Sequence, residues 1–455
     1  LNNYAEAIEL YNELVAALDK KEKKTQNHYL QYVKCINNMM KNHIALNEVD
    51  KALELTKNIT NLMKNDAHFS KAFKSNVQEY CSFTFLLGSI YESQRKTDKA
   101  IRLYLRGLGL CARNTANQEN YPEALKRISA LYISKKDFQQ AFEYMKRLCE
   151  YYELNNSNQV KEIAETYVSM GDITSGYDDY GKAIKFYLKG LELAKKAKPE
   201  DYPTHIKIMM KIANVYKGLK ENDNALTYYL DVLELKKQVY GKDSEEHINS
   251  VKEIGELYAS IDNHKRSLDY FRYYYEWAKK KTDPENMDLI EALSRLANAH
   301  MMLGDYPKAL EFYLIYSERI RELKGERHED YFASLDKLSL VYCKQDKLQQ
   351  SLEIQFKSLQ LKEERGKFSR NTVIALNNIG DTYFALENYQ DALKYHTLCL
   401  ERVEKIEKMA QEFSAQILLN IAHDHEKLGD SGKALESVFK SFKFVKGRGG
   451  YMDME

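Results

Sequence analysis

The chain has 455 residues, and its 68 Lys and Arg against 67 Asp and Glu give a formal net charge of +1. This even balance supplies no overall positive field for nucleic acid or for an anionic membrane surface, and we expect neither as a partner. No apolar run reaches the roughly 18 residues that a membrane-spanning helix needs, so we expect no membrane insertion.

The first predicted element, residues 1–24, is the second half of a truncated helical hairpin. Its sequence LNNYAEAIELYNEL starts at Leu1 and enters a helical pattern at once. We therefore expect the sequence to be a segment of a longer protein. The whole chain holds only 5 prolines and 19 glycines, which favours long helices over a loop-rich β fold.

Residues 25–120 are predicted to form irregular hairpins. A small residue marks the second helix of each hairpin, and we call it the anchor; the first three anchors are Ala7, Ala52 and Ala100. The step from Ala52 to Ala100 is the longest in the chain, and its extra length lies near NDAHFSKAFKS. Met40 also occupies a position that is small in the other hairpins. We expect an insertion and irregular packing in this region.

Residues 121–446 are predicted to form a regular array with a period of 42 residues. Successive anchors from Ala100 onward are 41 or 42 residues apart. A fixed period indicates a repeat architecture in which each unit packs only on its neighbours. The tail, residues 447–455, is predicted to be frayed or linker-like. The anchors of the array are Ala141, Ala183, Ala225, Ser267, Ala309, Ser351, Ala392 and Ala434.

A second small residue, which we call the landmark, precedes most anchors by twelve positions and lies on the first helix of the hairpin, helix A. An aromatic residue or His follows most landmarks by three positions, and Tyr or Phe follows most anchors on helix B by four. Two small residues let antiparallel helices approach closely, while the rings fill the flanking space. Turns such as LGDYPK and LKENDN carry Gly, Asp or Asn, which end one helix and cap the next. The landmarks are Gly88, Ser129, Gly171, Ala213, Gly255, Ala297, Ser339, Gly380 and Ala422.

This pattern of small residue and Tyr on helix A, then Ala and aromatic on helix B, resembles the tetratricopeptide repeat (TPR). The period exceeds the usual value of about 34 and is similar to that of kinesin light chain repeats, in segments such as GKDSEEHINSVKEIGELY, although the His-Pro of those links is absent. The resemblance implies an all-α fold, an α-solenoid of tandem antiparallel helical hairpins stacked as a right-handed superhelix. It also implies that helix A faces a concave groove and that the partners are other proteins.

The position two residues before each landmark, which the resemblance directs into the groove, forms a row that is basic or amide apart from one Ser and one Glu. Lys and Arg pair with carboxylates, and Asn can clamp a peptide backbone, so one hypothesis is a groove that binds an acidic peptide or helix. The alternative is a solvated inner face with local ion pairs. The row contains Arg127, Ser169, Lys211, Glu253, Arg295, Lys337, Asn378 and Asn420, and a neighbouring stripe holds Asn214, Asn298, Asp381 and His423.

A second feature is the aromatic run that ends at Trp277. The position seven residues after the anchor is small in several hairpins, as at Gly190, but Tyr274 and Tyr316 occupy it in two neighbouring ones. One interpretation is an exposed aromatic platform at Tyr274 and Trp277, because Tyr and Trp are frequent interface anchors. The alternative is ordinary core filling, which the helical spacing favours.

Motifs of catalysis are missing from the sequence. There is no G-x-x-x-x-G-K-[ST], G-x-G-x-x-G, G-x-S-x-G or H-E-x-x-H. His423 and His425 are two residues apart, so on a helix they point in different directions. The 6 cysteines form no C-x-x-C pair and fit small buried residues of a reducing compartment. We expect no enzyme activity, no cofactor and no metal site.

The function favoured by these features is a non-enzymatic protein-interaction scaffold or adaptor of the cytoplasm, which binds partner segments in its groove. The alternative is a structural subunit of a large cytoskeletal assembly, ciliary, axonemal or associated with a microtubule motor. An adaptor needs a free groove, whereas a lattice component uses its convex faces and ends. In both cases the chain would belong to a multi-protein complex.

Overall fold

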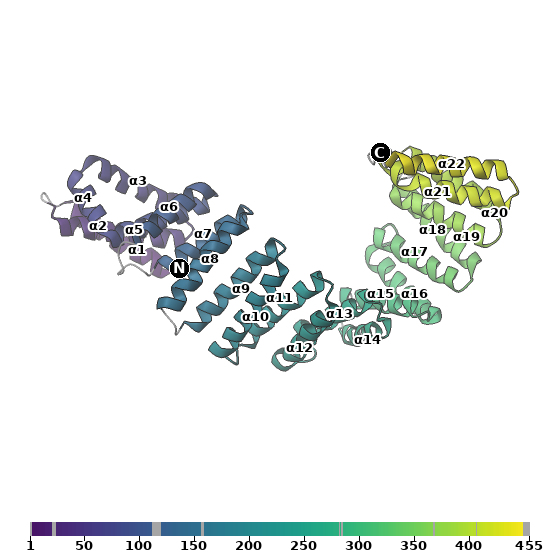
Figure 1. The fold of residues 1–455 in the computed structure, drawn as a ribbon, viewed down its shortest axis with the longest axis horizontal. Coiled ribbons are helices and arrows are strands. Elements are labelled where there is room, and N and C mark those ends of the chain that lie inside the picture. Colours follow the sequence, from purple (N-terminus) through teal and green to yellow (C-terminus); the bar gives the residue numbers. More distant parts are fainter. Residues whose placement is uncertain are drawn as a thin grey trace, which may run out of the picture. The chain divides into compact units, whose positions relative to one another are not determined.

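The structure, a computed structural model, describes residues 2–20, 24–111, 120–155, 159–281, 283, 285–366, 369–405 and 407–448. Within these ranges the chain forms 22 helices and no strand (Figure 1). The predicted all-α solenoid is therefore confirmed. The chain divides into two compact units, Leu1–Leu235 and Lys236–Glu455, each of which is described by itself. Most of the predicted tail, from residue 449 onward, lies outside the described residues.

The first unit is a stack of helices in which each helix packs on the next along the chain. Helix α12 begins in this unit and continues into the second one. The helices are α1 (Asn2–Asp19), α2 (Gln26–Ala45), α3 (Val49–Asn65), α4 (Ala67–Ser75), α5 (Val77–Ser93), α6 (Thr97–Cys111), α7 (Tyr121–Ser134), α8 (Phe138–Asn155), α9 (Val160–Gly176), α10 (Tyr180–Ala197), α11 (Tyr202–Gly218) and α12 (Asn222–Tyr240).

The second unit repeats the same arrangement, with odd-numbered helices as helix A and even-numbered ones as helix B. Each helix A packs on its own helix B, and each helix A from residue 287 onward also packs on the helix B before it. The helices are α13 (Glu245–Ser260), α14 (His264–Lys279), α15 (Met287–Met302), α16 (Tyr306–Lys324), α17 (Glu329–Lys344), α18 (Leu348–Arg365), α19 (Arg370–Ala385), α20 (Tyr389–Glu404), α21 (Glu407–Lys427) and α22 (Ser431–Arg448).

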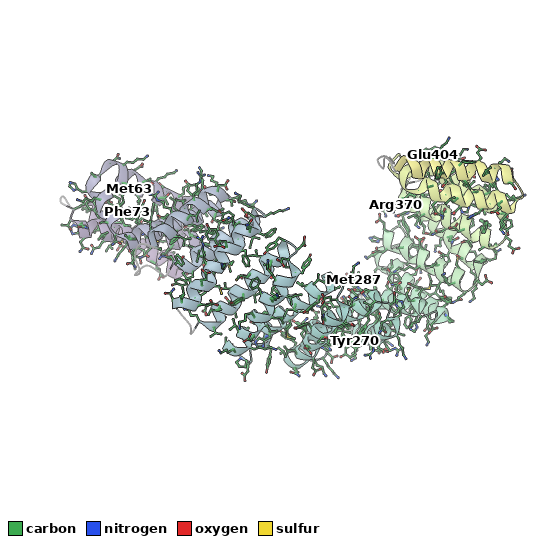
Figure 2. The ribbon with its side chains drawn as sticks, in the orientation of Figure 1. Met63, Phe73, Tyr270, Met287, Arg370 and Glu404 are labelled. Carbon is green, nitrogen blue, oxygen red and sulfur yellow. The ribbon has the colours of Figure 1, made fainter. Side chains whose placement is uncertain are left out.

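The expected insertion is the short helix α4, which packs on α2, α3 and α5. Asp66 caps it by accepting a hydrogen bond from the backbone N–H of Phe69, at 2.9 Å. Phe69 and Phe73 are fully buried, with their ring centroids 5.9 Å apart, and Figure 2 labels Phe73. The irregular first hairpins thus hold together through an additional aromatic helix.

The close crossing of helices A and B follows the predicted small residues. Anchors from Ala52 to Ala392 are at most 1% exposed. At one crossing the Ser129 hydroxyl donates to the carbonyl oxygen of Ala141, at 2.9 Å, which ties landmark to anchor. Beside the crossing, a ring three residues after the landmark stacks on a ring three residues after the anchor. These pairs are Tyr132–Tyr144, Tyr216–Tyr228, Tyr258–Tyr270, His300–Phe312 and Tyr383–Tyr395.

All ten turns between a helix A and its helix B use one backbone geometry. The residue five positions before the anchor has a positive φ, and only Gly304 and Gly429 are glycines at this place. The next N–H then bonds back across the helix end, as from Asp137 to the Tyr132 carbonyl at 2.9 Å. This is the hydrogen-bond pattern of a Schellman helix end, which satisfies the last carbonyls of helix A.

Replacing Lys136, whose φ is 60°, by glycine is expected to stabilise the first unit. A side chain disfavours this left-handed conformation, so Lys136→Gly should raise the free energy of unfolding by about 0.5 to 1 kcal/mol. Lys136→Val, which adds a β-branched side chain at the same exposed position, should lower it by about 1 kcal/mol. Urea unfolding followed by circular dichroism checks both signs, and a stabilising valine would contradict the expectation.

Candidate functional site

The ring four residues after the anchor lies over the landmark and reaches the helix A surface. At Gly171 an added Cβ would lie only 2.5 Å from the ring of Tyr187, so glycine is what lets the ring cross there. The Tyr187 hydroxyl then donates to Asp172 Oδ1 at 2.7 Å. The same connection occurs from Tyr229 to Asn214, from Tyr313 to Asn298 and from His396 to Asp381.

The residue that follows the landmark is also held by the next helix A. Lys211 on α11 forms an ion pair with Asp172 on α9, and Asn420 on α21 donates to Asp381 on α19 at 3.1 Å. The row predicted from the sequence therefore links one hairpin to the next. For Lys211, the structure contains the alternative that the sequence left open, a local ion pair, and the partner is Asp172.

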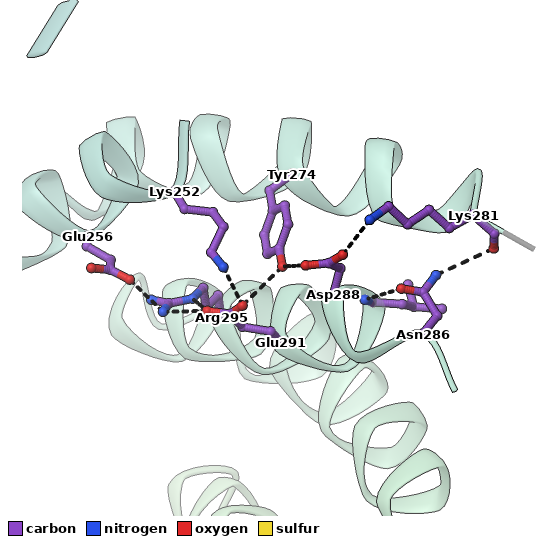
Figure 3. Close-up of polar contacts among 9 residues, drawn as sticks. Lys252, Glu256, Tyr274, Lys281, Asn286, Asp288, Glu291 and Arg295 are labelled. Carbon is purple, nitrogen blue, oxygen red and sulfur yellow. Dashed lines mark hydrogen bonds and ion pairs between the residues drawn. The ribbon is translucent and has the colours of Figure 1, made fainter. Parts of the chain in front are cut away.

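A larger network of this kind joins α13, α14 and α15, as Figure 3 shows. Glu291 accepts from Lys252 and Arg295, and Arg295 also pairs with Glu256. The hydroxyl of Tyr274 donates to Asp288 at 2.9 Å and to Glu291 at 3.1 Å. Alternating charges thus connect α13 with α15, and the Tyr274 hydroxyl joins α14 to the same network.

Tyr274 and Trp277 do not form an exposed aromatic platform, so that interpretation is wrong. Tyr274 is fully buried and Trp277 is 9% exposed. The indole N–H of Trp277 donates to the carbonyl oxygen of Asp243 at 2.9 Å, and the ammonium of Lys281 lies 4.0 Å from the ring centroid. The alternative, core filling, holds because the Tyr274 ring is buried while its hydroxyl finds acceptors on the next helix A, the half-exposed Asp288 and Glu291.

Lys337 differs from the other cations of the row. Its ammonium is half-buried and donates to Ser294 Oγ at 2.9 Å, and it lies 5.7 and 5.4 Å from the ring centroids of Tyr313 and Tyr316. Burial, together with the nearby Arg295 guanidinium, lowers the pKa of Lys337 below that of an ordinary lysine. Within the described part of the chain no carboxylate forms an ion pair with it. Its charge is therefore uncompensated.

Asn214 and Asn298 each present an amide group on an exposed helix A surface. Their side-chain oxygens accept from the hydroxyls of Tyr229 and Tyr313, which fixes the orientation of each amide. Among the described residues, neither amide nitrogen has a hydrogen-bond partner, so both donors stay available. These are donors of the kind that can hold a peptide carbonyl.

The remaining predicted residues of the row differ in the ion pairs and hydrogen bonds that they form. Arg127 pairs with Glu92 and Glu123, at 3.2 and 2.9 Å. Asn378 is half-buried on α19. Asn420 donates to Asn377 at 3.1 Å in addition to Asp381. The predicted residues that lie together around Tyr313 and keep an unpaired donor or charge are therefore Asn298 and Lys337. Arg295 lies near Lys337 but is already paired with Glu256 and Glu291.

A buried ionic cluster in the second unit escaped the sequence analysis. His396 is 1% exposed, and its Nδ1 lies 2.6 Å from Asp424 Oδ2, which is fully buried. Its Nε2 lies 3.2 Å from Asp381 Oδ1. The signal was a His four residues after the anchor, the place that Tyr occupies in several other hairpins, such as those of Tyr187, Tyr229 and Tyr313. The cluster connects α19, α20 and α21 and has a structural role.

Two cavities open between neighbouring helices A in the first unit. The larger, of about 530 Å³, lies between α9 and α11 beside the end of α10, and the smaller, of about 310 Å³, lies among α2, α5, α6 and α7. Among the described residues no group of His, Cys, Asp and Glu side chains is placed to hold a metal ion. In the same part of the chain no helix combines the length and the apolarity needed to cross a membrane.

Comparison with known families gives a clear result. A family model described as tetratricopeptide repeat matches residues 205–280, 288–364 and 371–438. A second model with the same description matches residues 84–118. Together the two cover just over half of the chain. No curated protein matches the sequence.

Solved structures with similar folds share little sequence with the chain. The C-terminal part of a TPR repeat-containing protein from Cytophaga hutchinsonii is 18% identical, with a TM-score of 0.45, over 63% of this chain and 94% of that one. BtubC (BKLC) from P. vanneervenii is 17% identical, with a TM-score of 0.44, over 51% and 94%. Kinesin light chain TPR-like repeats of Podosopora anserina are 12% identical, with a TM-score of 0.40, over 46% and 99%.

Proposed function

The chain belongs to the tetratricopeptide repeat family, and from this premise we propose that it is a non-enzymatic adaptor that binds an acidic segment of a partner protein on helices α15 and α17. TPR arrays are in general interaction scaffolds for other proteins. The more specific part of the proposal concerns which surface of the array binds the partner and which chemical groups of the partner it recognises.

The observation that carries the proposal is the uncompensated charge of Lys337. A half-buried ammonium without a carboxylate is unfavourable, and a carboxylate brought by a ligand relieves this cost. The adjacent Arg295 already has two carboxylate partners on the chain, but its positive charge still contributes to the lowered pKa of Lys337. The pair therefore favours an incoming anion over an incoming cation.

Asn298 supports a peptide as the source of that anion. It lies one residue after the landmark Ala297, and Tyr313 holds its amide oxygen. The free amide nitrogen can donate to a backbone carbonyl, while Lys337, whose ammonium also lies over the ring of Tyr313, pairs with an acidic side chain. A carboxylate alone would use only the second of these contacts, so the combination selects an acidic peptide segment.

Lys337→Glu is expected to weaken the binding of a short fluorescent peptide rich in Asp and Glu by about tenfold or more, because a second anion replaces the unpaired cation. The matched control is Lys344→Glu, an exposed change of the same charge near the end of the same helix. Fluorescence anisotropy at moderate salt gives both dissociation constants, and equal weakening in the two variants would contradict a specific site.

A further inference from the structure

Four apolar side chains on one side of α22, the helix drawn in yellow in Figure 1, are exposed to solvent. They are Leu435, Val438, Phe439 and Phe442, which are 57%, 43%, 61% and 60% exposed. Their spacing of three and four residues places them on one face of the helix. Every other phenylalanine side chain that the structure describes is buried or half-buried. A contiguous apolar patch of this kind marks an interaction surface.

The same face of a helix B is covered inside the array. In α10 the residues one, four and eight positions after the anchor are Ile184, Tyr187 and Leu191, and each is at most 9% exposed. They share one apolar core with Ile208 and Ile212 of α11, the next helix A. The exposed face of α22 is therefore one half of the interface through which hairpins stack on one another.

Two further residues extend this interface. Phe439 lies five residues after its anchor, where α18 carries Phe356, and the ring of Phe356 lies 6.3 Å from that of Tyr383 on α19. On α21, Leu419 is 37% exposed three residues before the landmark. Asn377, at the same position of α19, bonds to the next helix A. The patch, which we call the α22 face, thus consists of the four α22 residues and Leu419.

The size of the α22 face suits a pair of copies. From the exposed fractions, its apolar surface is about 500 Å² per chain, so two faces would bury about 1,000 Å², the area at which specific interfaces begin. The removal of this apolar surface from water favours association. A reversible dimer is the form that an interface of this size supports.

The α22 face is self-complementary when two α22 helices lie antiparallel. With the midpoint of the crossing between residues 438 and 439, Leu435 of one copy faces Phe442 of the other. Val438 faces Phe439 in the same way, so each ring meets a smaller aliphatic side chain. The macrodipoles of the two helices also oppose each other in this arrangement, which favours it.

The charges beside the face favour the same orientation. Glu436 lies on one flank of the face, and Lys440 and Lys443 follow on that flank one and two turns later. In an antiparallel pair Glu436 of each copy lies opposite the two lysines of the other, whereas a parallel pair would bring like charges together. Lys440 already pairs with Glu436 at 2.7 Å. Lys443 has no ion-pair or hydrogen-bond partner among the described residues and is available.

We infer that a second copy of this chain covers the α22 face, and that the two copies associate through antiparallel α22 helices about a twofold axis. This surface is separate from the proposed peptide site at Lys337, so either can fail without the other.

Sedimentation velocity of the full chain at about 1 to 100 µM tests the association, and we expect a reversible dimer with a micromolar dissociation constant. Phe439→Glu combined with Phe442→Glu should weaken it by about tenfold or more, because two charges enter the apolar interface. The matched control is Leu314→Glu combined with Ile315→Glu, which changes two exposed apolar residues of α16 and should leave the constant unchanged.

A mixing experiment tests the antiparallel orientation. Glu436→Lys makes the flank entirely positive, and Lys440→Glu combined with Lys443→Glu makes it entirely negative. Each of these variants alone should dimerise more weakly than the unaltered chain, and an equal mixture should form heterodimers about tenfold tighter than either. Effects within one helix cannot produce this preference for the mixture, and circular dichroism checks that both variants fold.

Three results would overturn the inference. One is a chain that stays monomeric at about 100 µM, which would leave the α22 face to a different segment or protein. Another is a dimer that survives the double phenylalanine substitution. The last is a mixture of the charge variants that associates no more tightly than each variant does by itself.

Discussion

His396→Ala is expected to lower the free energy of unfolding of the second unit by about 3 to 5 kcal/mol. The imidazole is 1% exposed and lies between Asp424 and Asp381, at 2.6 and 3.2 Å. Its removal leaves the fully buried Asp424 carboxylate without a cation, and Oδ1 of that residue already lacks a hydrogen-bond partner. Denaturant unfolding measures the change.

The same cluster predicts how stability depends on pH. Burial by itself would lower the pKa of His396, but the hydrogen bonds and charges of Asp381 and Asp424 outweigh it and raise the pKa to about 9. Because the folded pKa lies above that of the unfolded imidazole, the stabilisation is complete below a pH of about 6.5 and is lost as the pH rises towards about 9. His396→Ala should lack this loss of stability between the two values.

A second variant separates charge from packing. His396→Tyr introduces the residue type that several other hairpins carry at this place and keeps a ring over Gly380. Its hydroxyl can reach Asp381, as Tyr187 reaches Asp172. Asp424 would still lose its cation, so the variant should remain destabilised by more than about 2 kcal/mol. Wild-type stability in His396→Tyr would show that the ring alone matters.

Gly171→Leu is expected to destabilise the first unit by at least about 3 kcal/mol, since the crossing of α9 and α10 has no room for a side chain. An added Cβ would lie 2.5 Å from Cε1 of Tyr187, and the displaced ring would also lose its bond to Asp172. Thermal unfolding of the full chain measures the effect.

The matched control is the same substitution at Gly109 on α6, where an added Cβ meets no atom within 4 Å. Gly109→Leu should be neutral or stabilise by up to about 0.8 kcal/mol, because leucine favours the helix more than glycine does. Changes in stability of opposite sign at the two glycines would establish that the landmark glycine is required by packing. Similar losses at both would contradict this view of the hairpin crossing.

The repeat could be predicted from the sequence because packing at the crossing depends on small residues at fixed spacing. Nine anchors, from Ala52 to Ala392, are buried as that spacing requires. The extra length before Ala100 also indicated an insertion, which is the short helix α4. A local pattern suffices here because each hairpin contacts only its neighbours.

The hydrogen-bond and ion-pair partners of the row residues could not be predicted, because these partners lie about 40 residues away on the preceding hairpin. Lys211 and Lys337 occupy the same repeat position, yet one pairs with Asp172 and the other has only Ser294 and two rings. The difference depends on the residue of the preceding helix A within reach of each ammonium. Tyr274 was ambiguous for a similar reason, since the acceptors of its hydroxyl belong to the next helix A.

The most direct test of the central claim is photo-crosslinking from a benzophenone amino acid that replaces Met302, an exposed residue one helical turn after Asn298 on α15, in the full chain expressed in cells. A second chain with the same probe at Leu314, an exposed position on helix B α16, serves as the reference. The account predicts that position 302 links to acidic segments of partner proteins, and that adding Lys337→Glu abolishes those links. Links formed only from position 314, or links at 302 that survive Lys337→Glu, would contradict it.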